Sequence, residues 1–339
     1  MTGRFGIDRI GIVGGGAWGT ALGLVALRAG RSALLWARES EAVDGINRAH
    51  ENALFLPGVN LDPGLRATGE LAELGQCDAL LLAVPAQHLR AMAARLAPDL
   101  KPGIPLIVCA KGIEDGTGAL MSEVITETLP STPFAILSGP TFAAEVAAGL
   151  PTAITLATAD AELGQALATS LGSRAFRPYL TGDVTGAQIG GAIKNVIAIA
   201  CGIVMGKRLG DNARAALITR GLAEMARLAA AKGGRNETLM GLSGLGDLTL
   251  TCTSQQSRNH SLGVALGQGA ALGDILAQRR SVAEGVTSSR AAAALAQKLG
   301  VAMPIVSAVN AILHRGAAID GAIESLLARP FRTETTTAL

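Results

Sequence analysis

Short apolar runs of strand length alternate with segments of helical periodicity through the first half of the chain. The run 78–84, DALLLAV, is continuously apolar, as is typical of a strand covered on both faces of a parallel sheet. We predict strands at 9–13, 33–36, 78–84, 106–110, 134–138, 152–156 and 175–180, and helices at 17–29, 86–96 and 161–171. This rhythm predicts an α/β fold with a Rossmann-like, doubly wound sheet domain.

The pattern changes near Asp183, beyond which strand signals almost vanish. Alanine- and leucine-rich segments with helical spacing predict helices at 213–231, 261–267, 272–278 and 288–299, and a further helix that begins at Pro304. We therefore expect a dinucleotide-binding Rossmann domain over 1–183, followed by an all-α, substrate-binding domain over 184–339.

Lys194 is the only charged residue in the run 184–206, VTGAQIGGAIKNVIAIACGIVMG. A helix that is apolar nearly all round is typically buried, and burial lowers the pKa of a lysine toward values at which it exchanges protons. The pattern fits a catalytic lysine. The alternative is a snorkelling or salt-bridged core lysine, which this run alone does not disfavour.

Composition narrows the class of protein. Hydrophobic residues make up 49% of the 339 residues and charged residues 17%, which indicates a compact globular protein. A net charge of +2 and 3% aromatic residues argue against a nucleic-acid partner. The four cysteines form no CxxC pair and the four histidines are widely spaced, so we expect a reducing compartment and no metal.

The N-terminus superficially resembles an export signal, because Arg4 and Arg9 precede the uncharged run 10–27. Glycines interrupt this run, and it reads as strand, turn and helix, so we interpret it as part of the fold. The longest uncharged segments contain Gly or Pro or are interrupted by Lys194, so we expect no membrane insertion and a cytoplasmic protein.

A GxGxxG motif lies between the first predicted strand and helix. Gly14 permits a tight turn, Gly16 lets the backbone approach a pyrophosphate, and Gly19 allows close packing of helix on strand. The phosphates would bind the free amides at the helix N-terminus. The alternative is a purely structural glycine turn.

Arg38 follows the second predicted strand, where an NAD-specific site usually has an acidic residue. A guanidinium here favours the 2′-phosphate of NADP. Glu39 and Glu41 weaken this inference, and the alternative is a solvated loop arginine. We expect NADP(H) to be preferred and NAD(H) to be accepted.

Three further strand exits carry residues suited to a ligand site at the carboxyl edge of the sheet: Val84–Ala86, Lys111 and Ser138–Phe142. In the helical half, Asp247 follows a glycine-rich turn, and Ser257, Arg258 and Asn259 together suggest a phosphate clamp. Glu284 is a candidate acceptor for a cofactor amide or ribose. The alternatives are ordinary turns, a helix N-cap at Asp247, a polar loop at 257–259, and an exposed Glu284.

Longer blocks carry a specific resemblance. The segments GIVGGGAWGTAL, NALFLPG, VPAQ, AKGIE, SGPTFAAEVAAGLPTA, GGAIKNVIAIACGI, NARAALITRGLAEM, GLSGLGDLTLTCTSQQSRN and VAEGV occur in this order over about 10–315. The chain resembles the soluble bacterial NAD(P)-dependent sn-glycerol-3-phosphate dehydrogenases. That resemblance implies reversible hydride transfer between NAD(P)H and dihydroxyacetone phosphate, which supplies phospholipid synthesis, in a cytoplasmic enzyme that is usually a homodimer.

The resemblance also implies roles for individual residues. Lys194 is implied to be the proton donor and acceptor, with Lys111 and Asp247 beside it. Cofactor contacts are implied for Ala17, Trp18, Arg38, Lys111, Ala143, Arg258, Val282 and Glu284, and substrate contacts for Lys111, Gly139, Thr141, Lys194, Asp247, Ser257, Arg258 and Asn259. Gly15, between two other glycines, is expected to be a position that tolerates any small residue.

Two other protein classes are also compatible with the sequence. A β-hydroxyacid dehydrogenase or ketopantoate-reductase relative also joins a Rossmann domain to a helical domain, although the QSRN segment suits a phosphorylated substrate better. A nucleotide-sensing protein without catalysis keeps the same fold, but it does not require Lys111, Lys194 and Asp247 together.

Overall fold

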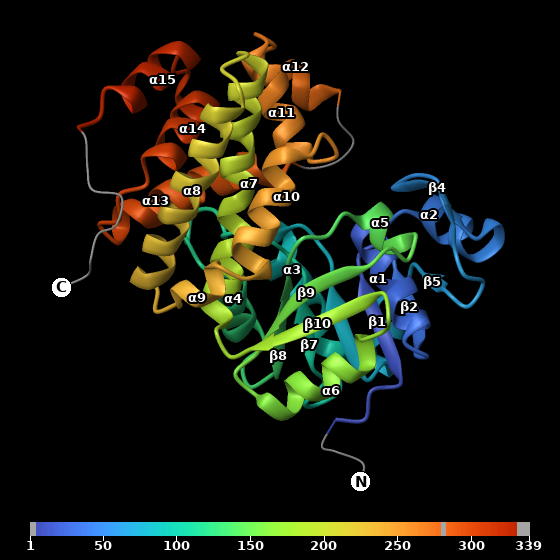
Figure 1. Ribbon diagram of the computed structural model, residues 1–339. Coiled ribbons are helices and arrows are strands. Elements are labelled where there is room, and N and C mark those ends of the chain that lie inside the picture. Colours follow the sequence, from blue (N-terminus) through green and yellow to red (C-terminus); the bar gives the residue numbers. More distant parts are fainter. Residues whose placement is uncertain (1–4, 279–282, 331–339) are drawn as a thin grey trace.

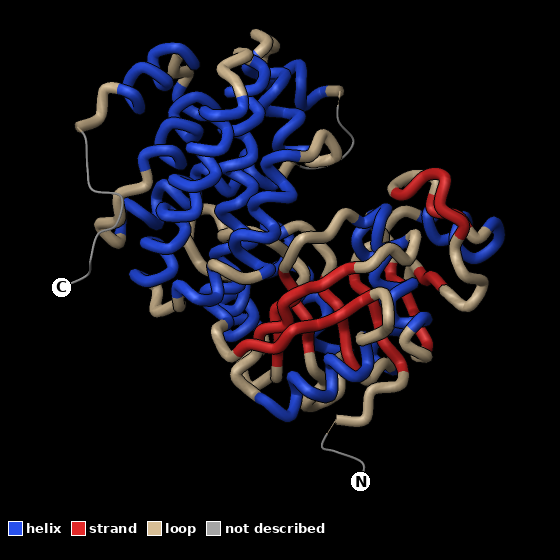
Figure 2. Tube along the Cα trace, viewed as in Figure 1, coloured by secondary structure: helices blue, strands red, loops and turns tan. Residues whose placement is uncertain are grey.

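A computed structural model describes residues 5–278 and 283–330 of the chain. The N-terminal half forms a sheet with helices packed around it, and the C-terminal half is helical and lies against one end of that sheet (Figures 1 and 2). The strands are β1 (Arg9–Val13), β2 (Ser32–Trp36), β3 (Glu51–Asn52), β4 (Leu56–Asn60), β5 (Arg66–Thr68), β6 (Ala79–Leu82), β7 (Leu106–Val108), β8 (Phe134–Ser138), β9 (Thr152–Ala157) and β10 (Phe176–Thr181).

The main sheet has eight strands in the order β10-β9-β8-β7-β6-β1-β2-β5, and β3 and β4 form a separate hairpin. Neighbouring strands are parallel except for the antiparallel pair β8 and β9. The central strand β6 is fully buried, as a strand with helices on both faces must be. This sheet, followed by a helical half, confirms the predicted fold class.

The helices of the first half are short, and those of the second half surround one long helix. They are α1 (Ala17–Arg28), α2 (Ser40–Asp44), α3 (Leu89–Leu96), α4 (Met121–Thr128), α5 (Ala143–Ala147), α6 (Ala161–Leu171), α7 (Val184–Gly206), α8 (Asp211–Ala231), α9 (Asn236–Leu239), α10 (Asp247–Thr253), α11 (Arg258–Gly267), α12 (Leu272–Ala277), α13 (Glu284–Lys298), α14 (Pro304–Arg315) and α15 (Ile319–Leu327). Short 3₁₀ segments lie at 71–76, 86–88 and 97–99, and π-helical turns at 45–49 and 242–246.

Several elements differ from the prediction for identifiable reasons. Strands β3 and β5 have only two and three residues, too few to show an alternating pattern. The predicted strand 78–84 ends at Leu82, and the helix predicted from Ala86 begins as a 3₁₀ turn that becomes α3 at Leu89. Strand β4 and helices α2, α4, α9 and α15 were also not predicted.

Helix α7 is the core of the helical half. It has 23 residues, of which nearly all are buried, and α8, α10, α11 and α13 pack around it. By length and composition it is apolar enough to cross a membrane, and it is the only such helix among the described residues. However, 89% of its most apolar window is buried inside the protein, as expected for the central helix of a bundle.

Helices α7 and α11 approach each other so closely that their backbones touch. Gly202 and Gly206 on α7 face Gly263 and Gly267 on α11. A Cβ atom at Gly202 would lie 2.1 Å from the carbonyl oxygen of His260. Small residues four apart on two facing helices permit this backbone contact, which places the N-terminus of α11 beside the middle of α7.

We predict that Gly202→Ala destabilises the protein by about 1–3 kcal/mol, because the added methyl group must push backbone apart. Gly273→Ala is the matched control, since a Cβ at this helical glycine meets no atom within 4 Å. The control should be neutral or slightly stabilising. Urea unfolding of both variants measures the difference, and equal stabilities would contradict the close contact.

Glu224 on α8 is a buried carboxylate that caps another helix. It is 1% exposed and accepts hydrogen bonds from the backbone amides of Ile305 (2.7 Å) and Val306 (3.2 Å) in the first turn of α14. Burial raises the pKa of Glu224 to about 7, although the two amides and two arginines, Arg227 and Arg329, oppose the rise. The carboxylate of Glu224 therefore satisfies amides at the start of α14, while burial disfavours its ionised form.

This carboxylate makes stability depend on pH. A pKa that is higher in the folded than in the unfolded chain contributes stability that is present below about pH 4.5 and is lost as pH rises through about 7. We predict that Glu224→Gln removes this loss, which amounts to about 3 kcal/mol at most for a shift of this size. Unfolding free energies across this pH range, with the exposed Glu237→Gln as control, measure it. A parallel decline in wild type and Glu224→Gln would refute the assignment.

Candidate active site

Asp247 holds two lysines at the junction of the two halves. Its carboxylate is fully buried at the first residue of α10, and each oxygen binds a different ammonium group. Lys194 Nζ lies 2.5 Å from Oδ1, and Lys111 Nζ lies 2.8 Å from Oδ2. The cluster joins residues from the segment after β7, from α7 and from α10, which are distant in sequence. Two cations thus face one carboxylate, and the carboxylate of Glu284 also interacts with both lysines.

Lys111 reaches the cluster from the carboxyl edge of the sheet. It follows β7, and its ammonium group also donates to the carbonyl oxygen of Gly139 (2.8 Å), at the end of the neighbouring strand β8. Gly191 makes room for this arrangement, because a Cβ there would lie 2.6 Å from Ser138 Oγ and 3.4 Å from Lys111 Cγ. The sheet edge therefore packs directly on the backbone of α7.

The environment of Lys194 favours proton exchange. Burial lowers its pKa to about 8, with Lys111 adding to the effect and Asp247 opposing it. Lys194 is therefore a buried, salt-bridged lysine, as one interpretation of the sequence expected, and its pKa is also close to neutrality, as a proton-exchanging lysine requires. Proton donors and acceptors work best when their pKa lies near the working pH.

Thr251 belongs to the same cluster, and Asn195 lies next to it and binds Asn259, but neither was identified from the sequence. Lys194 Nζ donates to Thr251 Oγ1 (3.0 Å), and this hydroxyl donates to the backbone oxygen of Asp247 (2.6 Å). Thr251 lies one helical turn after Asp247 on α10, a spacing that would have revealed it. Asn195 follows Lys194 directly on α7.

The residues at the start of α11 play distinct roles. Asn259 donates to Asn195 Oδ1 (2.9 Å) and accepts from the backbone amide of Gly285 (3.0 Å), so it links α7 to α13. Ser257 is buried, and its hydroxyl caps α11 by accepting from the amide of His260. Arg258 is the exposed member of the three. The backbone contact of α7 and α11 brings this helix start to the Lys194 cluster.

The glycine turn fits a dinucleotide. Gly14 has a φ of 122°, and a Cβ at Gly19 would lie 1.9 Å from the carbonyl oxygen of Gly14. Nothing lies within 4 Å of a Cβ position at Gly16, the N-cap of α1, and no side chain caps this helix. The amides at this helix start are thus available to a pyrophosphate. Trp18 Nε1 nearby is buried without a hydrogen-bond partner among the described residues.

The surroundings of Gly15 contradict the expectation that this position tolerates any small residue. A Cβ there would lie 2.5 Å from the Cβ of Ala37, so the glycine loop packs directly on the end of β2. Arg38 follows Ala37 in the chain, and its largely exposed side chain pairs with Glu39 (2.6 Å). The guanidinium therefore already has an anionic partner beside the proposed cofactor site.

The other predicted residues lie around the same edge. Glu284, at the start of α13, is partly buried rather than exposed and accepts from the backbone amide of Ala86 (3.3 Å), which bridges the two halves. Burial raises the pKa of Glu284. Three predicted cofactor contacts, Ala17, Trp18 and Ala143, pack on one apolar cluster of the sheet domain. Thr141 Oγ1 donates to the Gly139 oxygen (3.3 Å), and Val282 lies outside the described residues.

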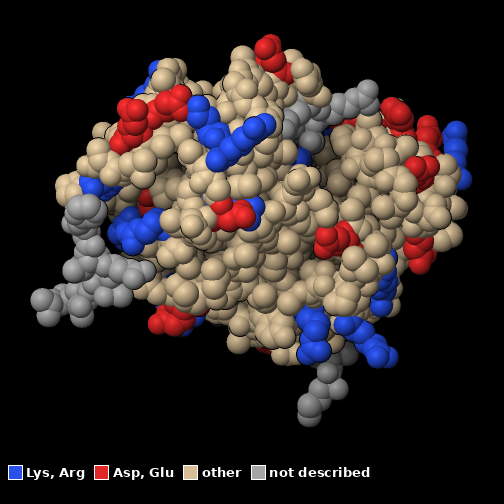
Figure 3. Space-filling view, turned by 45° about the horizontal axis from the view of Figure 1, so that its top comes forward, with Lys and Arg blue, Asp and Glu red and all other residues tan. Residues whose placement is uncertain are grey.

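Basic and acidic side chains are both present and scattered on the face of the molecule shown in Figure 3. The described residues contain no cluster of His, Cys, Asp or Glu that suits a metal ion.

Comparison with known families agrees with this geometry. The N-terminal region of the NAD-dependent glycerol-3-phosphate dehydrogenases matches residues 9–164, and the C-terminal region of the same family matches residues 183–324. The chain belongs to this family of dehydrogenases. Similar proteins from other bacteria carry the name glycerol-3-phosphate dehydrogenase [NAD(P)+].

Two such dehydrogenases cover nearly the whole chain. The protein of Rhodospirillum rubrum is 59% identical over 97% of this chain and 94% of its own length. The protein of Parvibaculum lavamentivorans is 56% identical over 96% of this chain and 98% of its own length. Among solved structures, the glycerol-3-phosphate dehydrogenase of Coxiella burnetii superposes with a TM-score of 0.92 at 40% identity, covering 95% of this chain and 99% of that one.

The rival enzyme class is related by fold alone. A ketopantoate reductase from Ralstonia eutropha has a TM-score of 0.62 at 16% identity. This likeness is far weaker than the match to the glycerol-3-phosphate dehydrogenases, so the ketopantoate-reductase alternative is set aside.

Proposed function

We propose that this dehydrogenase interconverts dihydroxyacetone phosphate and sn-glycerol 3-phosphate with NAD(P)H, and that Lys194 transfers the proton. The observation that carries the proposal is the buried Lys194–Asp247–Lys111 cluster at the sheet edge. The names of the family and of its members indicate the substrate and the cofactor.

The residues of the cluster have complementary tasks. When bound, the nicotinamide supplies or accepts the hydride at C2 of the substrate. During reduction, negative charge develops on the carbonyl oxygen, and the protonated Lys194 donates a proton to it. The ammonium group of Lys111 stabilises the same charge. During oxidation, the neutral form of Lys194 takes the proton from the C2 hydroxyl. Asp247 and Thr251 hold the Lys194 amine in place throughout.

The start of α11 is suited to hold the substrate phosphate. Arg258 offers a guanidinium that binds phosphate in a bidentate manner, and the amide of Asn259 is fixed by Asn195 and Gly285. Gly139 and Thr141 border the position of the reacting carbon. Ser257 contributes by capping the helix that carries these groups. Binding energy from the remote phosphate thereby positions the reacting carbon at Lys194.

The cofactor would be held by the turn Gly14–Gly19, with Ala17, Trp18 and Ala143 beside it and with Glu284 and Arg258 contributed by the helical half. Arg38 supports a preference for NADP(H), with NAD(H) also accepted. We assign dinucleotide binding to residues 1–183 and substrate binding to residues 184–339. A homodimer in the cytoplasm, engaged in phospholipid synthesis, is part of the same proposal.

The test of the function is the rate and pH dependence of dihydroxyacetone phosphate reduction, followed by NADPH absorbance. Lys194→Ala should lose about 10²–10⁴-fold in kcat while it still binds NADPH. Lys298→Ala, which removes an exposed lysine of α13, is the control and should retain activity. A kcat for Lys194→Ala within a few-fold of wild type would exclude the assigned role.

The pKa of Lys194 determines whether kcat/KM rises or falls with pH in each direction of the reaction. With a pKa of about 8, the protonated form needed for reduction dominates below this pH, so kcat/KM for reduction should fall above about pH 8. The neutral form needed for oxidation dominates above it, so kcat/KM for glycerol 3-phosphate should rise through the same pH. Profiles that bend in the same direction would contradict one shared acid–base group.

Arg38 should set the choice of cofactor. Arg38→Asp replaces attraction by repulsion of a 2′-phosphate and should reverse a preference for NADPH. Glu39→Gln removes the carboxylate that now pairs with Arg38 and should increase that preference. The ratio of kcat/KM for NADPH and NADH in wild type and both variants is the measurement. A wild-type preference for NADH, or an unchanged ratio in Arg38→Asp, would show that Arg38 does not bind the phosphate.

A further inference from the structure

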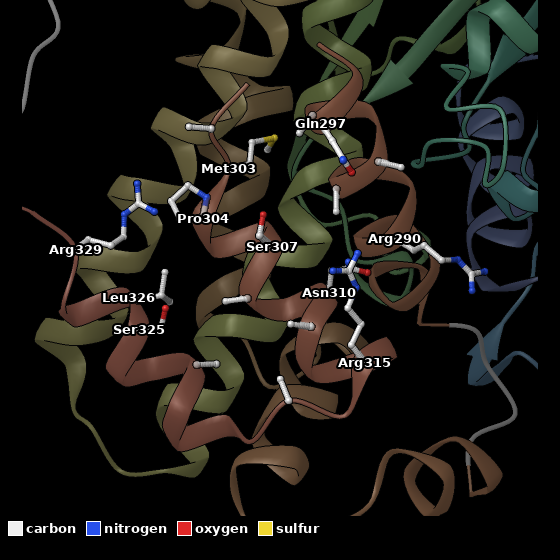
Figure 4. Close-up of a pocket in the computed structure, with 18 of the residues that line it drawn as sticks. Arg290, Gln297, Met303, Pro304, Ser307, Asn310, Arg315, Ser325, Leu326 and Arg329 are labelled. Carbon is white, nitrogen blue, oxygen red and sulfur yellow. The ribbon is translucent and has the colours of Figure 1, made fainter. Parts of the chain in front are cut away.

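The proposed reaction leaves two features of the described residues without a role. One is a hollow of about 890 Å³ between α13, α14 and α15 (Figure 4), where Arg290 is already paired with Asp115 of the sheet domain. The other is a pair of buried polar side chains beside the glycine turn, Asn52 (1% exposed) and Thr20 (0% exposed). This pair contacts the proposed cofactor site directly, and its hydrogen bonds indicate a function.

Asn52 comes from outside the main sheet. It is the second residue of β3, in the hairpin that β3 forms with β4, and it begins the segment NALFLPG. Leu56 in β4 and Leu61 just after it are buried in the same apolar cluster as residues of β1 and β2. Strand β4 also contacts α5, beside which it lies in Figure 1. The hairpin is therefore packed against the sheet domain, and Asn52 reaches the glycine turn from a supported position.

The hydrogen bonds of Asn52 have a defined direction. Its Oδ1 accepts from the backbone amide of Phe55 (3.2 Å), so its Nδ2 faces the glycine turn. The two Nδ2 hydrogens go to the carbonyl oxygen of Gly15 (2.8 Å) and to Thr20 Oγ1 (2.8 Å). The hydroxyl of Thr20 in turn donates its single hydrogen to the carbonyl oxygen of Gly16 (3.0 Å). Asn52 thus holds one carbonyl of the turn directly and the next through Thr20.

This network sets the direction in which the peptides of the turn face. The peptide between Gly15 and Gly16 is trans, so its N–H points opposite to its C=O. Holding the Gly15 carbonyl toward Asn52 therefore turns the Gly16 N–H away from Asn52. Three consecutive glycines, Gly14–Gly16, also permit the flipped orientation, in which a carbonyl oxygen would face the phosphates. No side chain at Gly15 can restrict this freedom, because its Cβ would lie 2.5 Å from that of Ala37. The orientation of the peptide thus depends on a donor from outside the turn.

We propose that Asn52 is a positioning residue for the cofactor: it keeps the N–H groups of the glycine turn available to the pyrophosphate and turns the carbonyl oxygens away. This inference rests on the dinucleotide binding proposed above. A turn that is flipped in part of the population binds with an apparent affinity reduced by the competent fraction. Because NADPH and NADH share the pyrophosphate, Asn52 acts on the affinity for both, whereas Arg38 selects between them.

The test is calorimetric titration of the full-length protein with NADPH and with NADH, without substrate. Asn52→Leu keeps a similar volume and removes both donors, and it should raise the two Kd values by the same factor, about tenfold. Asn47→Leu is the matched control. The Asn47 side chain, in the turn before the hairpin, binds the backbone of Ala67 (2.8 and 2.9 Å), so this variant should keep the wild-type Kd values. Unchanged Kd values in Asn52→Leu would overturn the proposal.

Turnover separates positioning of the cofactor from general damage to the fold. In Asn52→Leu, KM for NADPH should rise while kcat at saturating NADPH stays within about twofold of wild type. A lower kcat with an unchanged KM for NADPH would show a purely structural role and overturn the proposal.

A second residue of the network keeps the proposal testable if Asn52→Leu does not fold. Thr20→Val removes the hydroxyl but leaves Asn52 in place, and it should raise both Kd values about threefold. Thr20→Ser keeps the hydroxyl and should bind as wild type does. Equal Kd values in Thr20→Val and Thr20→Ser would contradict the network.

The outcomes also distinguish this inference from the proposed function. A wild-type protein that binds neither dinucleotide would overturn both. If wild type binds NADPH and reduces dihydroxyacetone phosphate, and Asn52→Leu binds NADPH equally well, only the role of Asn52 fails. If wild type binds NADPH without reducing dihydroxyacetone phosphate, and Asn52→Leu binds more weakly, the proposed function fails and the role of Asn52 is supported.

Discussion

The candidate active site depends on one buried carboxylate. Without Asp247, Lys194 would be an unpaired ammonium group inside an apolar helix bundle, an arrangement that proteins avoid by neutralising or exposing the charge. With Asp247, the amine remains buried 2.5 Å from its partner, and its pKa falls only to about 8. The second oxygen of the same carboxylate holds Lys111 and so ties the sheet edge to the helical half. A single side chain thereby sets both the chemistry and the alignment of the two halves.

Glycines determine how closely the other elements can approach that carboxylate. Gly191 admits the side chains of Ser138 and Lys111 against α7. On the same helix, a Cβ at Gly190 would lie 2.3 Å from the carbonyl oxygen of Ser243, in the turn that leads into α10. Farther along, Gly202 and Gly206 bring α11 and its polar start alongside. The glycines of α7 that weaken it as an isolated helix are therefore what allow three other elements to pack closely against it.

The features visible in the sequence were those that depend on local pattern. Lys194 is a lone charge in an apolar run, and the glycine turn has a fixed spacing, so both were predicted from the chain alone. The pairing of Lys194 with Asp247 joins positions far apart in the chain, and no pattern predicts which acid meets which base. Gly15 was misjudged because its neighbour, Ala37, comes from another strand. The role of Ser257 as a helix cap emerged only once the start of α11 was known.

The composition of α7 also bears on how the chain is made. Before α11 and α13 emerge from the ribosome, α7 is an uncovered stretch of 23 residues with enough mean hydropathy to enter a lipid bilayer. Lys194 lies near its midpoint, where a lysine disfavours insertion by about 2.5–3.5 kcal/mol. The group proposed to carry the proton during turnover therefore also lowers the tendency of this helix, taken by itself, to enter a bilayer.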